Sequence, residues 1–159
     1  MNKVYRKGAT GALLDEYEKA VTELQQVIRD IPDHLLVHIA DPLTSDDNCR
    51  SVQTVLAHVV SSAYSYAIYI QDLYHPPALR PEKKFRTTAA DFEKDLSDAF
   101  LFTTVVFENI KDSELEEKKI AARWGQAYDI EQMMEHAIVH VLRHRRQLER
   151  FRISLGVPL

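Results

Sequence analysis

The stretch YDIEQMMEHAIVHVLRHRRQLERF, residues 128–151, decides the fold and the chemistry predicted for this chain. It contains three of the seven histidines, His136, His140 and His144, each four residues after the last. Residues four apart lie on one face of an α-helix, so two imidazoles at this spacing can reach a single metal ion. A fourth histidine, His58, lies in another strongly helical stretch, SVQTVLAHVVSSAYSYAIYI. We therefore expect two helices to come together and close a three-histidine site.

The hydrophobic pattern of the last predicted helix, residues 129–153, ranks its three histidines. Four apolar residues mark the centre of its buried face: Ile130, Met134, Val141 and Leu148. At about 100° per residue, His144 lies about 60° from that centre, His140 about 100° and His136 about 140°. We therefore expect His140 and His144 to form the inward pair, with His136 nearer the rim.

His58 lies on the helix predicted at residues 51–73, at the margin of its apolar stripe. By the same angular count it falls close to Ser62, Ser65 and Tyr69. This position suits a metal ligand, because the metal has to reach both its protein ligands and a substrate. The alternative is a half-exposed histidine that hydrogen-bonds to solvent, and the pattern of this helix alone leaves both open.

Apolar residues recur at three- and four-residue steps in two further stretches, residues 10–30 and 89–111. Together with residues 51–73 and 129–153, they predict four helices that pack as one bundle. The predicted fold class is therefore all-α, a four-helix bundle without a β-sheet.

The connections between the predicted helices differ in length and composition. Short extra helical turns are expected near residues 33–38 and 114–118, and residues 41–50, DPLTSDDNCR, are typical of a polar loop. Three prolines exclude a regular helix from residues 74–86, YHPPALRPEKKFR. Thirteen extended residues reach up to about 43 Å, more than the roughly 30 Å of a 20-residue helix. This linker can therefore cross the bundle lengthwise and leave the second and third helices parallel.

The composition indicates one globular domain, residues 1–159, with 45% apolar and 28% charged residues. A net charge of −4 disfavours non-specific nucleic-acid binding. The single cysteine, Cys49, cannot form an intrachain disulfide and suits a reducing cytoplasm. The first 20 residues have no apolar core of signal-peptide length, and no run approaches about 18 apolar residues, so we expect a cytoplasmic protein without a membrane partner.

Two further features carry weaker signals. His34 and His38 are also four residues apart, but they lie in a short segment flanked by loops, so we interpret them as surface histidines. Trp124 precedes the last helix as an aromatic plug over one end of the bundle. It either only packs there or contacts a substrate.

Basic residues follow closely on the histidines of the last helix: Arg143, Arg145, Arg146, Arg150 and Arg152. Positive charge at a helix C-terminus complements the helix dipole, and this interpretation together with solvation is the simpler one. Guanidinium groups can also bind a carboxylate or a phosphate, which is the second interpretation.

The segments SVQTVLAHVV, RWGQAYDIEQMMEHA and HAIVHVLRHRRQLERF together resemble the DinB/YfiT-like superfamily of small helical metalloproteins. The resemblance runs from the first helix to about Phe151. The family pattern has one histidine early in the second helix and an H-x-x-x-H pair in the last, followed by Arg-x-Gln-like residues. His58 matches the first position, and His140 and His144, before Arg145 and Gln147, match the pair. Arg146 stands where many members have glycine.

The resemblance implies a four-helix bundle with a crossover between parallel helices, often as a homodimer. It implies a divalent metal ion, commonly zinc or nickel, held by His58, His140 and His144. Three neutral imidazoles also suit iron or copper, and manganese is a further alternative. A dimer is also suggested by the broad apolar arc of the first helix: Leu13, Leu14, Tyr17 and Val21.

Two functions are consistent with these features. Through the resemblance, the protein is expected to be a metal-dependent enzyme, either a hydrolase or a transferase or isomerase that uses a low-molecular-weight thiol. The alternative is a non-catalytic metal-binding or stress-associated helical protein. The catalytic residues stay unknown, since Glu135 and Glu149 are candidate bases only by their proximity in sequence. An open fourth coordination position beside a pocket would favour the enzyme with a small-molecule substrate.

Overall fold

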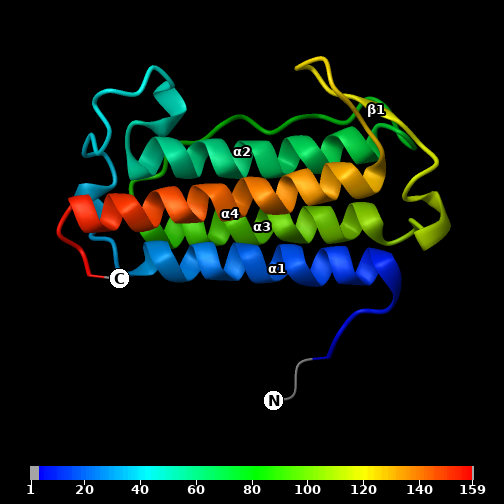
Figure 1. Cartoon of the computed structure of the whole chain (residues 1–159), viewed down its shortest axis with the longest axis horizontal. Coiled ribbons are helices and arrows are strands. Elements are labelled where there is room, and N and C mark those ends of the chain that lie inside the picture. The colour runs from blue at the N-terminus through cyan, green and yellow to red at the C-terminus, as the bar shows by residue number, and fades with distance from the viewer. Residues whose placement is uncertain (1–3, 159) are drawn as a thin grey trace.

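The computed structural model describes residues 4–158, and that part of the chain is built mainly from four long α-helices (Figure 1). Their bounds are α1 Gly8–Arg29, α2 Val52–Gln71, α3 Ala89–Phe107 and α4 Ile130–Ser154. The predicted all-α class is confirmed, and each predicted helix is present. Within residues 4–158, no helix is both long enough and apolar enough to cross a membrane.

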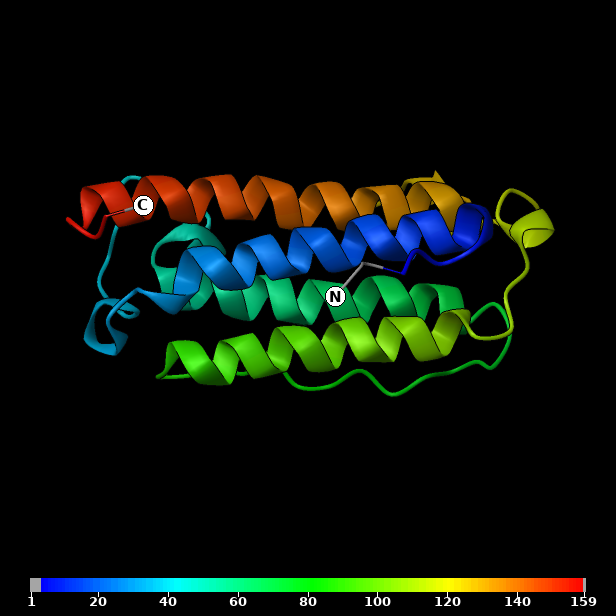
Figure 2. The ribbon, with the colours of Figure 1, turned by 90° about the horizontal axis from the view of Figure 1, so that it is seen from below.

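The four helices lie side by side, and each of them packs mainly on two others. α1 and α2 both contact α3 and α4 (Figure 2). α1 and α4 run in one direction, and α2 and α3 run in the opposite direction (Figures 1 and 2). The core between them is filled by large side chains that are almost fully buried: Tyr17, Leu24, Leu56, Phe92, Met133 and Leu148. This packing sets α2 beside α4, the two helices that carry the candidate ligands.

The linker between α2 and α3 runs back along the outside of α2, so that α2 and α3 are parallel (Figure 1). It is attached to the helices near both ends. The Asp72 carboxylate accepts a hydrogen bond from the backbone N–H of Ala78 at 2.7 Å, and the Gln53 amide donates to the carbonyl of Arg86 at 2.9 Å. The prediction that residues 74–86 are long enough to cross the bundle lengthwise is therefore confirmed.

Capping residues fix the starts of the two helices that carry the histidines. Ser51 and Thr54 form a reciprocal capping box at α2, and Asp129 and Gln132 form one at α4. Each box satisfies backbone N–H groups that the first turn of a helix leaves without partners. These caps set the residue at which each helix begins, and hence the position of its histidines along the helix axis.

α3 ends at Phe107, four residues before the predicted end of that helix. The chain turns there into a short 3-10 helix, Asp112–Glu114. The Asp112 carboxylate then accepts hydrogen bonds from the backbone N–H groups of Ala9 and Thr10, at 3.0 and 2.9 Å. Because Lys7 provides no side-chain cap for α1, this distant carboxylate takes that role. The predicted turn at residues 114–118 thus begins two residues earlier.

The prediction that the chain contains no sheet is wrong at one small hairpin. Strands β1 Ile120–Ala121 and β2 Ala127–Tyr128 pair in antiparallel register (Figure 1). Gly125 has φ +87°, a backbone conformation that favours glycine, and it allows the chain to reverse between the strands. The hairpin places the ring of Trp124 against Tyr66 and Tyr69 of α2 and His136 of α4.

Two more short 3-10 helices occur before α2. Asp33–Leu35 matches the turn predicted near residues 33–38. Asp47–Cys49 lies inside the stretch that was predicted as a polar loop. Its first turn is capped by the Asp46 carboxylate, which accepts from the backbone N–H of Asn48 at 2.9 Å.

The apolar arc of α1 is largely used inside one chain. Leu14, Tyr17 and Val21 are 7%, 1% and 6% exposed, and Leu13 is partly buried against the same core. The broad arc therefore serves the contacts of α1 with α3 and α4, and it gives less support to a second contact surface than its width suggested. The homodimer stays a prediction.

Candidate metal centre

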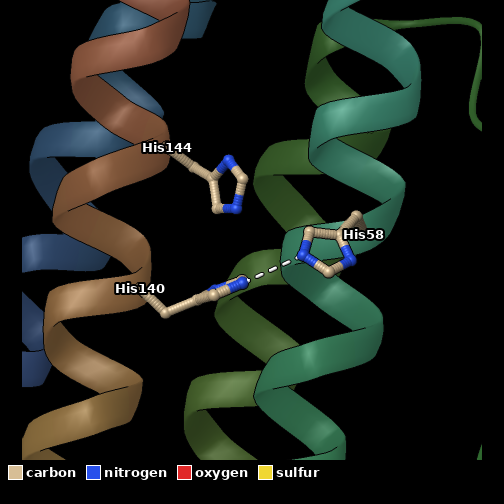
Figure 3. A group of neighbouring side chains, drawn as sticks. All are labelled: His58, His140 and His144. Carbon is tan, nitrogen blue, oxygen red and sulfur yellow. Dashed lines mark hydrogen bonds between the residues drawn. The ribbon is translucent and has the colours of Figure 1, made fainter. Parts of the chain in front are cut away.

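Helices α2 and α4 bring three histidines together across their interface. His58 comes from α2, and His140 and His144 come from successive turns of α4 (Figure 3). One ring nitrogen of each lies within 4.8 Å of one ring nitrogen of both others. His140 and His144 are each 4% exposed, whereas His58 is half-buried. The structure therefore assembles the three residues that the sequence singled out.

His58 and His140 face each other through their Nε2 atoms, which are 3.0 Å apart (Figure 3). At this distance one ring donates its Nε2–H and the other accepts, so the two rings hold different tautomers. The ring centroids of the three histidines lie 4.5 to 5.1 Å apart, and their planes are steeply inclined to each other. Ring nitrogens of the three side chains therefore face a common space (Figure 3).

His144 has one satisfied and one unsatisfied ring nitrogen. Its Nδ1 lies 2.8 Å from the Oε1 atom of Gln147, one turn further along α4. Because an amide oxygen only accepts, Nδ1 carries the proton and Nε2 carries the lone pair. That Nε2 atom is buried and has no hydrogen-bond partner among residues 4–158. A buried acceptor without a partner is costly, and a metal ion bound at this lone pair would satisfy it.

This donor set fits a divalent metal ion. Three imidazoles are a common catalytic zinc set, and metal–nitrogen bonds of about 2.0–2.1 Å put ligand nitrogens roughly 3.3 Å apart in a tetrahedral site. The 3.0 Å between Nε2 of His58 and Nε2 of His140 is close to that separation, and the unpartnered Nε2 of His144 supplies the third ligand nitrogen. Binding of a metal would release the proton that His58 and His140 share at Nε2. The Gln147 amide resembles the outer partners that fix the tautomer of a ligating histidine. Zinc, nickel, iron and copper all accept a set of neutral imidazoles.

Burial holds the three imidazoles in the neutral form that binds a metal. Burial, with smaller contributions from His144 and Lys83, lowers the pKa of His58 to about 4. Burial together with the neighbouring His144 and His58 lowers the pKa of His140 to about 2. Burial also lowers the pKa of His144, although the hydrogen bond to Gln147 raises it. All three rings are therefore uncharged at neutral pH.

His136 lies outside this group. Its ring is stacked on Trp124, with centroids 5.6 Å apart, and its centroid is 6.5 Å from that of His140. It is half-buried, and burial followed by the charge of Arg143 lowers its pKa. Its placement toward the rim agrees with the angular count, and a neutral imidazole there can accept a proton.

A cleft of about 420 Å³ opens beside the three histidines, between α2 and α4. His58, His140 and His136 lie in its wall, together with the three residues that the helical count placed near His58: Ser62, Ser65 and Tyr69. Tyr66 and Trp124 add aromatic surface. Trp124 is 50% exposed and donates its indole N–H to the Tyr128 hydroxyl at 3.1 Å. Trp124 therefore both packs and presents a face to the cleft.

The other sequence candidates lie away from the cleft. Glu135 is exposed on another face of α4, and Glu149 pairs with Arg145 at 3.5 Å, so neither lines the cleft. His34 and His38 are both exposed and do not belong to the histidine group, as their interpretation as surface residues predicted. Among residues 4–158, no aspartate or glutamate lies in the wall of this cleft as a candidate general base.

The sequence did not predict which arginines line the cleft and which bind other parts of the protein. Arg143 lines the cleft with two arginines that no motif marked, Arg80 of the linker and Arg123 of the hairpin. Arg145 instead pairs with Glu23, and Arg152 is 5% exposed and donates to the Val27 carbonyl at 2.8 Å. The position of Arg143, one turn after His140, was a usable signal. Arg80 and Arg123 reach the cleft only through tertiary structure.

Comparison of the chain with protein-family models and with curated proteins found no match.

Proposed function

We propose that the chain is a metal-dependent enzyme in which His58, His140 and His144 hold one divalent cation. The observation that carries the proposal is the Nε2 atom of His144, which is buried without a partner beside the facing nitrogens of His58 and His140. A divalent cation bound at this nitrogen would satisfy an acceptor that is otherwise costly to bury. Zinc or nickel is the expected ion.

The fold that we propose is a four-helix bundle of the DinB/YfiT-like type. It is supported by the parallel pair α2 and α3, by the lengthwise linker between them, and by the placement of the histidines on α2 and α4. Gln147, which completes the Arg-x-Gln part of the sequence resemblance, holds the ring of His144. Assembly as a homodimer is retained as part of this proposal, and light scattering at micromolar concentration tests it.

The reaction that we propose is hydrolysis, or the transfer or isomerisation of a group with a low-molecular-weight thiol. When bound, a divalent cation supplies Lewis-acid chemistry that activates water or stabilises a thiolate. Gln147 would keep His144 in the tautomer that can bind the cation. The cleft beside His58 and His140 would admit the substrate. The cleft supports the enzyme over the non-catalytic alternative, because a purely structural ion needs no adjacent space for a small molecule.

Elemental analysis of the purified protein, after dialysis against buffered zinc or nickel, tests the metal part of the proposal. We expect about one ion per chain and its loss on treatment with a chelator. Thiol-conjugation and ester-hydrolysis screens of the loaded and the chelated protein test the enzyme part. Metal binding without any metal-dependent turnover would favour the non-catalytic alternative, and absence of bound metal would remove the proposal.

A further inference from the structure

The wall of the cleft beside the histidines carries positive charge from three separate elements. Arg80 comes from the linker, Arg123 from the β-hairpin and Arg143 from α4. No aspartate or glutamate lines this cleft, and within residues 4–158 none of the three guanidinium groups forms an ion pair with a carboxylate. The whole chain has a net charge of −4, so the sign of the cleft is opposite to that of the molecule.

Tyr69 holds two of these arginines at the cleft. The guanidinium of Arg80 lies over its ring, 4.7 Å from the centroid, and the Tyr69 hydroxyl accepts a hydrogen bond from the backbone N–H of Arg123 at 3.0 Å. A cation stacked on an aromatic face keeps its N–H edges available for a ligand. Tyr69 therefore holds Arg80 through its guanidinium and Arg123 through its backbone, whereas the side chains of Arg123 and Arg143 are exposed at the cleft.

Aromatic rings form the rest of the wall. Trp124 meets Tyr66 and Tyr69 edge to face, with centroids 6.4 and 5.9 Å apart, and its ring is stacked on His136. Among the residues that line the cleft, the arginines are the side chains that stay charged throughout the physiological pH range. The fixed charge of the wall therefore comes from the arginines, and its apolar surface comes from flat rings.

Asp46 is a carboxylate that lies close enough to His58 to interact with it electrostatically. Asp46 is already engaged with the backbone and side-chain amides of Asn48, both at 2.9 Å. It does not line the cleft, so it leaves the three guanidinium groups without a partner there.

We propose that this cleft binds a small organic anion, a carboxylate or phosphate attached to a flat aromatic or unsaturated body. The anionic oxygens would contact Arg80, Arg123 and Arg143, and the flat body would lie against Trp124 and Tyr69. Guanidinium groups match carboxylate and phosphate oxygens through paired hydrogen bonds, and cleft aromatics recognise a planar body. The inference rests on the proposed function in one respect, since the anion would be the substrate that the metal-dependent reaction consumes.

Fluorescence of the metal-free protein tests the inference, because Trp124 is the sole tryptophan of the chain and lines the cleft. Benzoate and phenyl phosphate are titrated at low ionic strength in the presence of a chelator, with neutral benzamide as the matched probe. We expect saturable changes with the anions and at least about tenfold weaker binding of benzamide. The tighter of the two anions identifies the acidic group.

The triple variant Arg80→Gln, Arg123→Gln, Arg143→Gln removes the charge while leaving the aromatic wall. It should bind the better anion at least about tenfold more weakly, whereas the control Arg150→Gln, at an exposed position of α4 outside the cleft, should match the unmodified chain. Circular dichroism of the triple variant checks its helix content. Equal binding of benzoate, phenyl phosphate and benzamide, no anion binding at all, or full affinity in a folded triple variant would overturn the inference.

The metal content of the same preparations separates this inference from the proposed function. Protein that binds zinc but no anion keeps the proposed metal site and loses the anion site. Protein that binds the anion through the arginines but takes up no metal keeps the anion site and loses the proposed enzyme.

Discussion

Two pairs of histidines in this protein have the same spacing and different surroundings. His34 and His38 are four residues apart, as are His140 and His144. The first pair is exposed in a segment where only Asp33–Leu35 forms a 3-10 helix. The second pair is buried on the 25-residue helix α4 and faces His58 across the interface with α2.

The comparison shows that two histidines four residues apart in sequence lie on the same face only when a continuous α-helix contains both. A 3-10 turn of three residues does not hold residues four apart on one face, whereas an α-helix does. A packed neighbouring helix then supplies the third ligand and the burial that keeps the rings neutral. We therefore predict a metal site at His140 and His144 and none at His34 and His38.

The largest expected difference between the two histidine pairs is in the stability that the protein gains from added zinc. At a free zinc concentration of about 100 times Kd, the folded state should gain roughly 2.7 kcal/mol. Urea unfolding with buffered zinc and with a chelator measures this gain. His140→Ala should abolish most of it, and His38→Ala should retain it, with each variant compared with itself so that packing losses cancel. A zinc-dependent gain of the same size in His140→Ala would contradict the account.

Loss of the partner of His144 should produce the next largest effect. Gln147→Leu removes the oxygen that accepts from Nδ1, so the tautomer with a free Nε2 lone pair is no longer fixed. Outer partners of this kind typically contribute 10- to 100-fold to metal affinity, and competition with a chelator measures the change. Gln147→Glu, which keeps an accepting oxygen, serves as the control. If the leucine variant binds metal as tightly as the glutamate variant, Gln147 has no positioning role.

Acid should destabilise the metal-free protein through the buried histidines. The folded pKa of His58 is about 4 and that of His140 about 2, both below the unfolded value of about 6.5. The unfolded chain therefore binds more protons below pH 6.5, so the stabilisation is complete above that pH and decreases as pH falls toward 4. Each such histidine adds up to about 1.4 kcal/mol per pH unit to the loss.

Urea unfolding of the chelated protein across this pH window measures the slope. The variant His140→Gln, which cannot be protonated in the unfolded chain, should have a shallower slope than the unmodified protein. A slope that is unaltered in this variant would show that His140 does not stay neutral in the fold.

Changing the exposed pair should give the smallest effect. The double variant His34→Ala, His38→Ala removes two side chains that lie outside the histidine group and are open to solvent. Its free energy of unfolding should stay within about 0.5 kcal/mol of the unmodified protein, as is usual for surface positions. Its zinc content should also be unchanged, and a loss of zinc would move the site to the wrong pair.

Helical periodicity predicted much of this architecture because it records which face of each helix is buried. It placed the four helices, ranked His136 behind His140 and His144, and put His58 beside Ser62, Ser65 and Tyr69. Those calculations need only about 100° per residue and the position of the apolar stripe. The lengthwise linker followed from the proline content and the reach of an extended chain.

Features that depend on distant contacts were not predicted. Asp112 caps α1 from more than 100 residues away, and that contact accompanies the early end of α3. Arg80 and Arg123 reach the cleft from a linker and a hairpin, where no periodic pattern marks the direction of a side chain. The residue that orients His144 was visible in the sequence as Gln147, but its hydrogen bond required the helical structure around it.

The most direct test of the three-histidine site is the metal content of four single variants. His58, His136, His140 and His144 are each replaced by alanine, and bound metal is measured by elemental analysis after equilibration with buffered zinc. The account predicts that His136→Ala keeps the ion and that the other three lose most of it, because two imidazoles bind an ion much more weakly than three. Loss of metal in His136→Ala with retention in His144→Ala would place the site one helical turn away, and unchanged metal in all four would contradict the site itself.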